Sequence, residues 1–153
     1  MTSDKKKSGR QKKKYICWML SKKTKYGLKA LTNLARREDR SPVQISVISK
    51  EENISRKFLE SILLTLRKNG FLGSKKGKNG GYYLLKDPKD INISPVMRIL
   101  EGPIAMVPCV SLNFYETCDD CPDEKACAVH NLMIEVRDST LNIFNNTTLA
   151  DLI

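Results

Sequence analysis

The chain has 153 residues, a length that fits one compact domain, with or without a helical arm, and that buries a core without disulfide bonds. Lysine and arginine number 27 against 17 acidic residues, so the formal net charge is +10. This excess favours nucleic acid over an anionic membrane surface as the partner, although charge alone does not choose between them.

The first 18 residues are predicted to be a disordered basic tail. Seven lysines and arginines lie within residues 1–14, against the single acidic residue Asp4. So polar a stretch is either a phosphate-binding arm or a segment without a function. Residues 15–20 are apolar, but this run is too short for a signal peptide or a membrane span. We therefore expect a cytoplasmic protein.

Three helices are predicted next. Apolar residues at helical spacing after Ser21 predict a capped first helix at about residues 22–37, and residues 45–53 follow a polar loop as a short second helix. Ser55 can cap a third helix with its hydroxyl, and Gly70 ends it. The buried stripe of this third helix is Leu59, Ile62, Leu63 and Leu66. Two helices joined by so short a turn are typical of a helix-turn-helix, although helical hairpins also serve other roles.

A basic hairpin is predicted directly after the third helix. Residues 71–74 and 81–85 have the pattern of two short strands around a turn at residues 75–80. Gly77, Gly80 and Gly81 allow a tight turn with positive φ, and the lysines of the turn place positive charge where a wing meets a phosphate backbone. The alternative is an ordinary solvated β-turn, which the position after a helix-turn-helix disfavours.

Two further helices complete the chain. Ser94 and Pro95 predict the N-cap and first residue of a helix that ends at Gly102. Apolar residues three or four apart predict a long amphipathic helix at about residues 129–145. No other predicted helix matches its length, so we expect it to pair with a second copy in a homodimer rather than pack on its own domain.

Four of the five cysteines and the only histidine lie within residues 109–130. In a reducing compartment this clustering indicates metal ligands or redox thiols. Thiolates suit zinc or iron–sulfur clusters, and a Cys-x-x-Cys spacing presents two sulfurs to one site. The sequence leaves open a [2Fe-2S] or [4Fe-4S] cluster, a zinc site, redox thiols without metal, and cysteines without a role. The candidate ligands are Cys109, Cys118, Cys121, Cys127 and His130.

The chain resembles the IscR, NsrR, RirA and CymR family of bacterial regulators from about residue 19 to its C-terminus. The most specific motifs are Leu-Arg-Lys-Asn-Gly-Phe-Leu at residues 66–72 and Lys-Gly-Lys-Asn-Gly-Gly-Tyr at residues 76–82. Further similar segments are residues 20–31, 54–63, 100–103 and 145–152.

The resemblance implies a homodimer on a palindromic operator, with the third helix in the major groove and the wing over the adjacent minor groove. The residues that it places at or near double-stranded DNA are Ser55, Arg56, Lys57 and Glu60 in the helix, and Lys75, Lys76, Lys78 and Asn79 in the wing.

The resemblance also implies a set of cluster ligands. Cluster-bearing relatives bind iron through three cysteines that precede the long helix. Cys121 and Cys127 match the last two, and the first matches either Cys109 or Cys118. His130 matches the histidine of IscR-like members. Lys25 stands where NsrR-like members carry an aspartate ligand, which argues against the NsrR scheme.

The sequence therefore predicts a mainly α fold with a small β-hairpin wing, in which a winged helix-turn-helix domain carries a long C-terminal dimerisation helix. We expect a basic tail (1–18), the DNA-binding domain (19–103), a cysteine-rich sensor loop (104–130), and the dimerisation helix with a C-terminal tail (131–153). The predicted function is a dimeric transcription regulator that senses redox, iron–sulfur or metal state. Alternatives are the same fold with metal-free redox thiols, and a zinc-stapled adaptor or nucleic-acid-binding protein.

An enzyme with a small-molecule substrate is not expected. The chain has no second histidine, no nucleotide-binding glycine loop and no evident catalytic base paired with a nucleophile.

Overall fold

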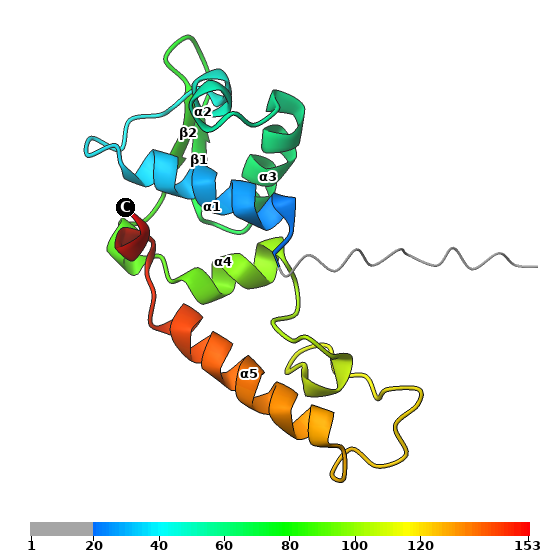
Figure 1. The fold of residues 1–153 in the computed structure, drawn as a ribbon. Coiled ribbons are helices and arrows are strands. Elements are labelled where there is room, and N and C mark those ends of the chain that lie inside the picture. The colour runs from blue at the N-terminus through cyan, green and yellow to red at the C-terminus, as the bar shows by residue number, and fades with distance from the viewer. Residues whose placement is uncertain (1–19) are drawn as a thin grey trace, which may run out of the picture.

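The computed structural model describes residues 20–153 (Figure 1). The predicted basic tail and Cys17 lie outside the described residues. The helices are α1 (Lys22–Ala35), α2 (Ile45–Glu52), α3 (Arg56–Lys68), α4 (Ile93–Leu100) and α5 (Ala128–Asn145). The strands are β1 (Leu72–Lys75) and β2 (Gly81–Leu84), and three short 3₁₀ turns are η1 (Pro88–Asp90), η2 (Pro108–Val110) and η3 (Leu149–Leu152). This order confirms the predicted mainly α fold with one hairpin.

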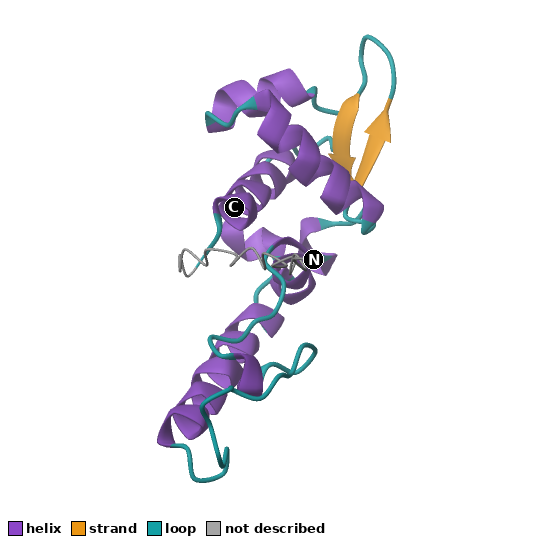
Figure 2. Cartoon of the chain, turned by 90° about the vertical axis from the view of Figure 1, so that its right-hand side faces the viewer, coloured by secondary structure: helices purple, strands orange, loops and turns teal. Residues whose placement is uncertain are grey.

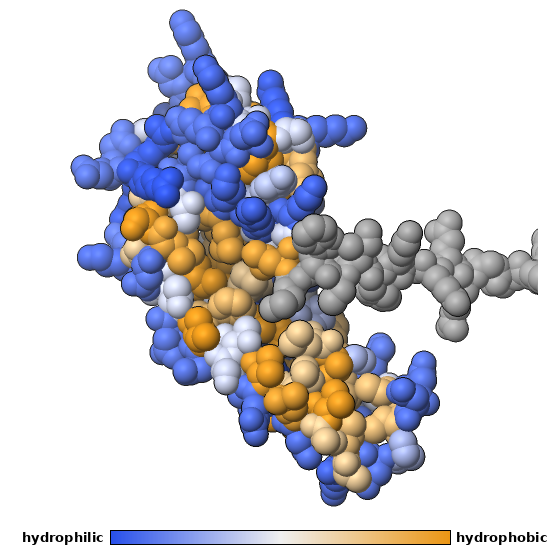
Figure 3. Space-filling view, viewed as in Figure 1, coloured by the Kyte–Doolittle hydropathy of each residue, from blue (hydrophilic) through white to orange (hydrophobic). Residues whose placement is uncertain are grey.

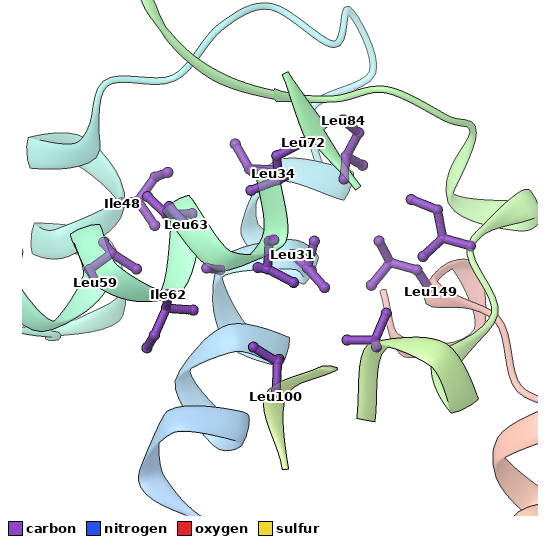
Figure 4. Close-up of a cluster of buried hydrophobic side chains, with 14 of the residues drawn as sticks. Leu31, Leu34, Ile48, Leu59, Ile62, Leu63, Leu72, Leu84, Leu100 and Leu149 are labelled. Atoms are coloured by element: carbon purple, nitrogen blue, oxygen red, sulfur yellow. The ribbon is translucent and has the colours of Figure 1, made fainter. Parts of the chain in front are cut away.

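The elements form a head, made of α1 to α4, the hairpin, η1 and η3, and an arm, made of α5 and the loop before it (Figures 1 and 2). The head has one hydrophobic core, to which α1, α3, α4 and both strands contribute (Figure 4). The predicted stripe of α3 is buried: Leu59, Ile62, Leu63 and Leu66 are all fully inaccessible. Burial of this stripe orients α3, so that its opposite face is left in solvent.

The start of α1 is capped as predicted. The Thr24 N–H donates to Ser21 Oγ over 3.1 Å. The Glu101 carboxylate accepts from Ser21 N at 3.0 Å and from Ser21 Oγ at 2.8 Å, which ties this N-terminus to the end of α4. Burial acts to raise the pKa of Glu101, but hydrogen bonds from Thr24 and Ser21 outweigh it, so the pKa is lowered.

Two predicted caps are wrong. Ser55 occupies the N-cap position of α3, but its side chain makes no capping hydrogen bond. The N-cap of α4 is Asn92 and not Ser94: Asn92 Oδ1 accepts from the Ser94 N–H at 3.0 Å, and Pro95 becomes the third helical residue. Contacts with the chain after α5 hold this segment: the Ile93 N–H donates to the Thr147 carbonyl at 2.9 Å, and Asn92 forms a β-bridge with Thr148.

The C-terminal turn belongs to the head. Leu149 is 0% exposed in the main core, and its N–H donates to the Ile91 carbonyl at 2.7 Å. An isolated β-bridge between Asn92 and Thr148 adds to this attachment. The chain after α5 therefore packs back against the head (Figure 1).

The arm exposes apolar side chains. Within α5 only Leu141 is buried, while Val129, Leu132 and Ile143 are 57%, 54% and 62% exposed. Figure 3 shows hydrophobic residues over the arm and hydrophilic residues around the wing end. No helix within residues 20–153 combines the length and hydropathy that crossing a bilayer requires.

Candidate DNA interface and cysteine pocket

The hairpin forms a wing, residues 72–84, that projects from the head at the same end as α2 and α3 (Figure 2). Its strands are antiparallel, with Leu72 opposite Leu84 and Lys75 opposite Gly81. Gly77 and Gly81 have the expected positive φ of 107° and 153°. Gly80 does not, and glycine is needed there for space, since a Cβ would lie 2.2 Å from the Lys75 carbonyl oxygen.

All eight predicted DNA contacts are exposed, at the N-terminal half of α3 and along the wing: Ser55, Arg56, Lys57, Glu60, Lys75, Lys76, Lys78 and Asn79. None of the basic residues in this set takes part in the four ion pairs of the described chain. Their positive charge is therefore not neutralised by a carboxylate of residues 20–153. An exposed helix N-terminus and an uncompensated basic wing at the same end of the head are chemically suited to duplex phosphates (Figure 1).

Three residues outside the predicted set position the wing. Val43 exchanges both backbone hydrogen bonds with Tyr82, at 2.9 Å each. Gln44 Nε2 donates to the Lys78 carbonyl at 2.9 Å, and Arg67 Nη1 donates to Ser74 Oγ at 2.9 Å. Sequence analysis missed Val43 and Gln44 because both fall in or beside a predicted loop, where no periodic signal marks them.

The cysteine candidates come together in one pocket of about 450 Å³ at the N-terminal end of α5. Four thiols and one imidazole line it, which we call the cysteine pocket: Cys109, Cys118, Cys121, Cys127 and His130. Cys109 is supplied by η2 and is buried, and the other three thiols are half-buried. The sequence left open whether Cys109 or Cys118 is the first candidate ligand, and both line this pocket.

His130 connects two of the thiols. Its Nδ1 lies 3.4 Å from Cys109 Sγ, and its backbone N–H donates to Cys127 Sγ, also over 3.4 Å. Cys127 is the N-cap of α5, so its sulfur sits at the positive end of an 18-residue helix. Arg137 Nη1 donates to the Val110 carbonyl at 2.8 Å and fastens η2 against α5.

The other two thiols, Cys118 and Cys121, have raised pKa values. A hydrogen bond with Cys109, followed by burial, raises the pKa of Cys118. Burial raises the pKa of Cys121, and repulsion from Cys127 adds to this shift. Both thiols are therefore harder to ionise than free cysteine, and a bound cation would have to displace their protons.

The thiols and the imidazole of the pocket are ligands that soft metals prefer, but their positions do not form a coordination shell. Within residues 20–153, no three histidine, cysteine, aspartate or glutamate side chains stand close enough together to hold a metal ion. Side-chain rotation within the pocket would therefore have to accompany metal binding. Tyr115 O–H donates to Glu124 Oε1 at 2.7 Å and closes the loop that carries Cys118 and Cys121.

A helix-turn-helix followed by a basic two-stranded wing defines a winged helix-turn-helix protein, a class of transcription regulator. The model of the Rrf2 family, described as an iron-dependent transcriptional regulator, matches residues 20–153, and the chain belongs to this family. An rrf2-like HTH-type transcriptional regulator of Rhodobacter capsulatus is 44% identical over 138 residues, which cover 88% of this chain and 92% of the relative.

Two solved structures are similar in fold and in sequence. CymR, described as the global cysteine regulator of B. subtilis, superposes with a TM-score of 0.72 at 32% identity, covering 89% of this chain and 96% of CymR. T. potens IscR gives 0.68 at 27% identity, covering 87% and 84%. These relatives are transcriptional regulators and not enzymes, in agreement with the sequence prediction.

Proposed function

We propose that this Rrf2-family regulator binds a palindromic operator as a homodimer, with α3 in the major groove and the wing on the neighbouring phosphates. The observation that carries the proposal is the set of basic side chains at the start of α3 and on the wing, which are exposed and form no ion pair within residues 20–153. Arg56 and Lys57 would contact bases or phosphates, and Lys76 and Lys78 would contact phosphates only.

Dimerisation through α5 is supported by its exposed apolar residues. Val129, Leu132 and Ile143 are each more than half exposed on a helix with a single buried residue. Apolar surface of this kind is removed from water when a second copy packs against it. A two-fold dimer would also repeat α3 at the spacing of operator half-sites.

We further propose that the cysteine pocket is the sensor. The pocket lies where η2 meets the N-terminus of α5, and Cys127 caps that helix. A change in the state of these thiols would alter both the cap and the η2 contact, and so the angle of the arm and the distance between the two α3 helices. Cys109, Cys118, Cys121 and Cys127, with His130 beside them, would hold zinc or an iron–sulfur cluster. A bound cluster would supply redox sensitivity.

A metal-free version of the sensor is the second candidate. It is supported by the four free thiols that line one pocket. In this version reversible oxidation of the thiols changes the pocket directly.

The test begins with anaerobic purification of the full chain, analysis for iron, zinc and sulfide, and a visible absorption spectrum. A duplex selected from a random pool then serves as the operator in binding assays before and after peroxide. The Cys127→Ser variant should lose the response, whereas Asn131→Ser, an exposed change on the same helix, should keep it. Iron with charge-transfer absorption supports a cluster, and a metal-free protein that responds supports the thiol version. A Cys127→Ser variant that responds normally refutes the sensor proposal.

A further inference from the structure

Gln44 occupies the N-cap position of α2 without capping it. Helix N-caps favour Ser, Thr, Asp and Asn, whose short side chains reach the free N–H groups of the first turn. The Gln44 amide instead donates to the backbone carbonyl of Lys78, 34 positions later in the chain, at 2.9 Å. Because a carbonyl oxygen only accepts, the amide nitrogen must be the atom that faces it.

This bond attaches the turn of the wing, residues 76–80, to the rest of the head. The bridge from Val43 to Tyr82 and the bond from Arg67 to Ser74 hold the strands. Among the hydrogen bonds of residues 20–153, the one from Gln44 is the only one that joins the turn at residues 76–80 to a residue outside the wing. Without it, the turn is held by its own strands and by the bond from the Gly80 N–H to the Gly77 carbonyl.

The orientation of this turn matters because two separate surfaces must meet one duplex. The start of α3 is fixed by the core, whereas Lys76 and Lys78 lie on an exposed turn that contains two glycines. A turn that is already ordered before binding loses less conformational entropy when the complex forms. Because Gln44 is the N-cap residue of α2, its bond connects the turn to the helix-turn-helix that contains α3.

We propose that Gln44 is a positioning residue for DNA binding, which holds the wing turn so that Lys76 and Lys78 reach the duplex that α3 reads. The inference rests on the proposed DNA-binding function and deepens it. Gln44 acts through the wing and needs no contact of its own with DNA.

A double-mutant cycle in the full chain tests this role. Gln44→Met removes the donor and keeps the length of the side chain. We expect it to weaken binding to the selected operator about fivefold, the factor that corresponds to the net value of one hydrogen bond. In a Lys76→Ala/Lys78→Ala background, the same change should cost less than about twofold, because the wing no longer contributes. The control is Thr32→Val, which removes a hydroxyl-to-carbonyl bond within α1 and should leave affinity unchanged.

The outcomes separate the inference from the proposed function. If the two lysine substitutions weaken binding but Gln44→Met does not, or if Gln44→Met costs the same in both backgrounds, the positioning role is refuted and the DNA interface stands. If the lysine substitutions leave binding unchanged, the wing interface and the role of Gln44 both fail. Loss of the bond should also lower the melting temperature of Gln44→Met by a few degrees. A lower melting temperature with unchanged operator affinity would refute the positioning role.

Discussion

Replacing Lys76 and Lys78 with alanine tests whether the wing touches phosphates. Both side chains are exposed, and neither has a carboxylate partner in the described chain, so each is free to displace one condensed counterion from DNA. Each phosphate contact contributes about 0.9 to the slope of log Kobs against log salt, so the double variant should lose about 1.8 from that slope. Between about 50 and 200 mM salt, the wild-type advantage in affinity should then shrink about tenfold.

Fluorescence anisotropy at a series of KCl concentrations measures this slope, on the selected operator and on a random duplex of equal length. The change should be the same on both duplexes, because phosphates carry no sequence information. Lys89→Ala, which removes an exposed lysine of η1 away from the wing, is the matched control and should keep the wild-type slope. An unchanged slope in the double variant, or an effect confined to the operator, would refute the phosphate assignment.

Three further outcomes are expected. Arg56→Ala should weaken operator binding by about 1–3 kcal/mol and random-duplex binding much less, because a base contact discriminates between sequences. Equal losses on both duplexes in a competition assay would contradict this. Leu149→Ala should lower the free energy of unfolding in urea by about 2–5 kcal/mol, because the side chain is fully buried, whereas Leu152→Ala at 41% exposure should cost far less. Glu101→Gln should flatten the acid side of the curve of stability against pH. Because the pKa of Glu101 is lowered, this carboxylate stabilises the fold above its ordinary pKa of 4.5, and the contribution is lost as the pH falls through the folded pKa. A variant that melts with the wild-type pH dependence would argue against the Ser21 and Thr24 contacts.

The elements of the head were predictable because their signals are local. Helical spacing placed α3 and its four buried residues, and the lysine- and glycine-rich stretch after Gly70 placed the wing to within a residue or two. These patterns depend on side chains that are close together in sequence and that share one face of one element. The same local reasoning identified the lysines of the wing and grouped the cysteines, since each set lies within a short segment, whereas the DNA-facing residues of α3 came from the family resemblance.

Long-range contacts decided the features that local patterns could not show. Ser94 has the right residue type for a cap, but Asn92 caps α4, in a segment that is bonded to Thr147 and Thr148 more than fifty residues away. The burial of Leu149 and the bond from Gln44 to Lys78 likewise join segments whose separation hides any pattern. The composition and periodicity of the chain thus specified which elements form and which chemistry they carry. Only the packed structure decided which cap is used, where the C-terminus docks and how the wing is held, because each of these depends on a partner that is distant in the chain.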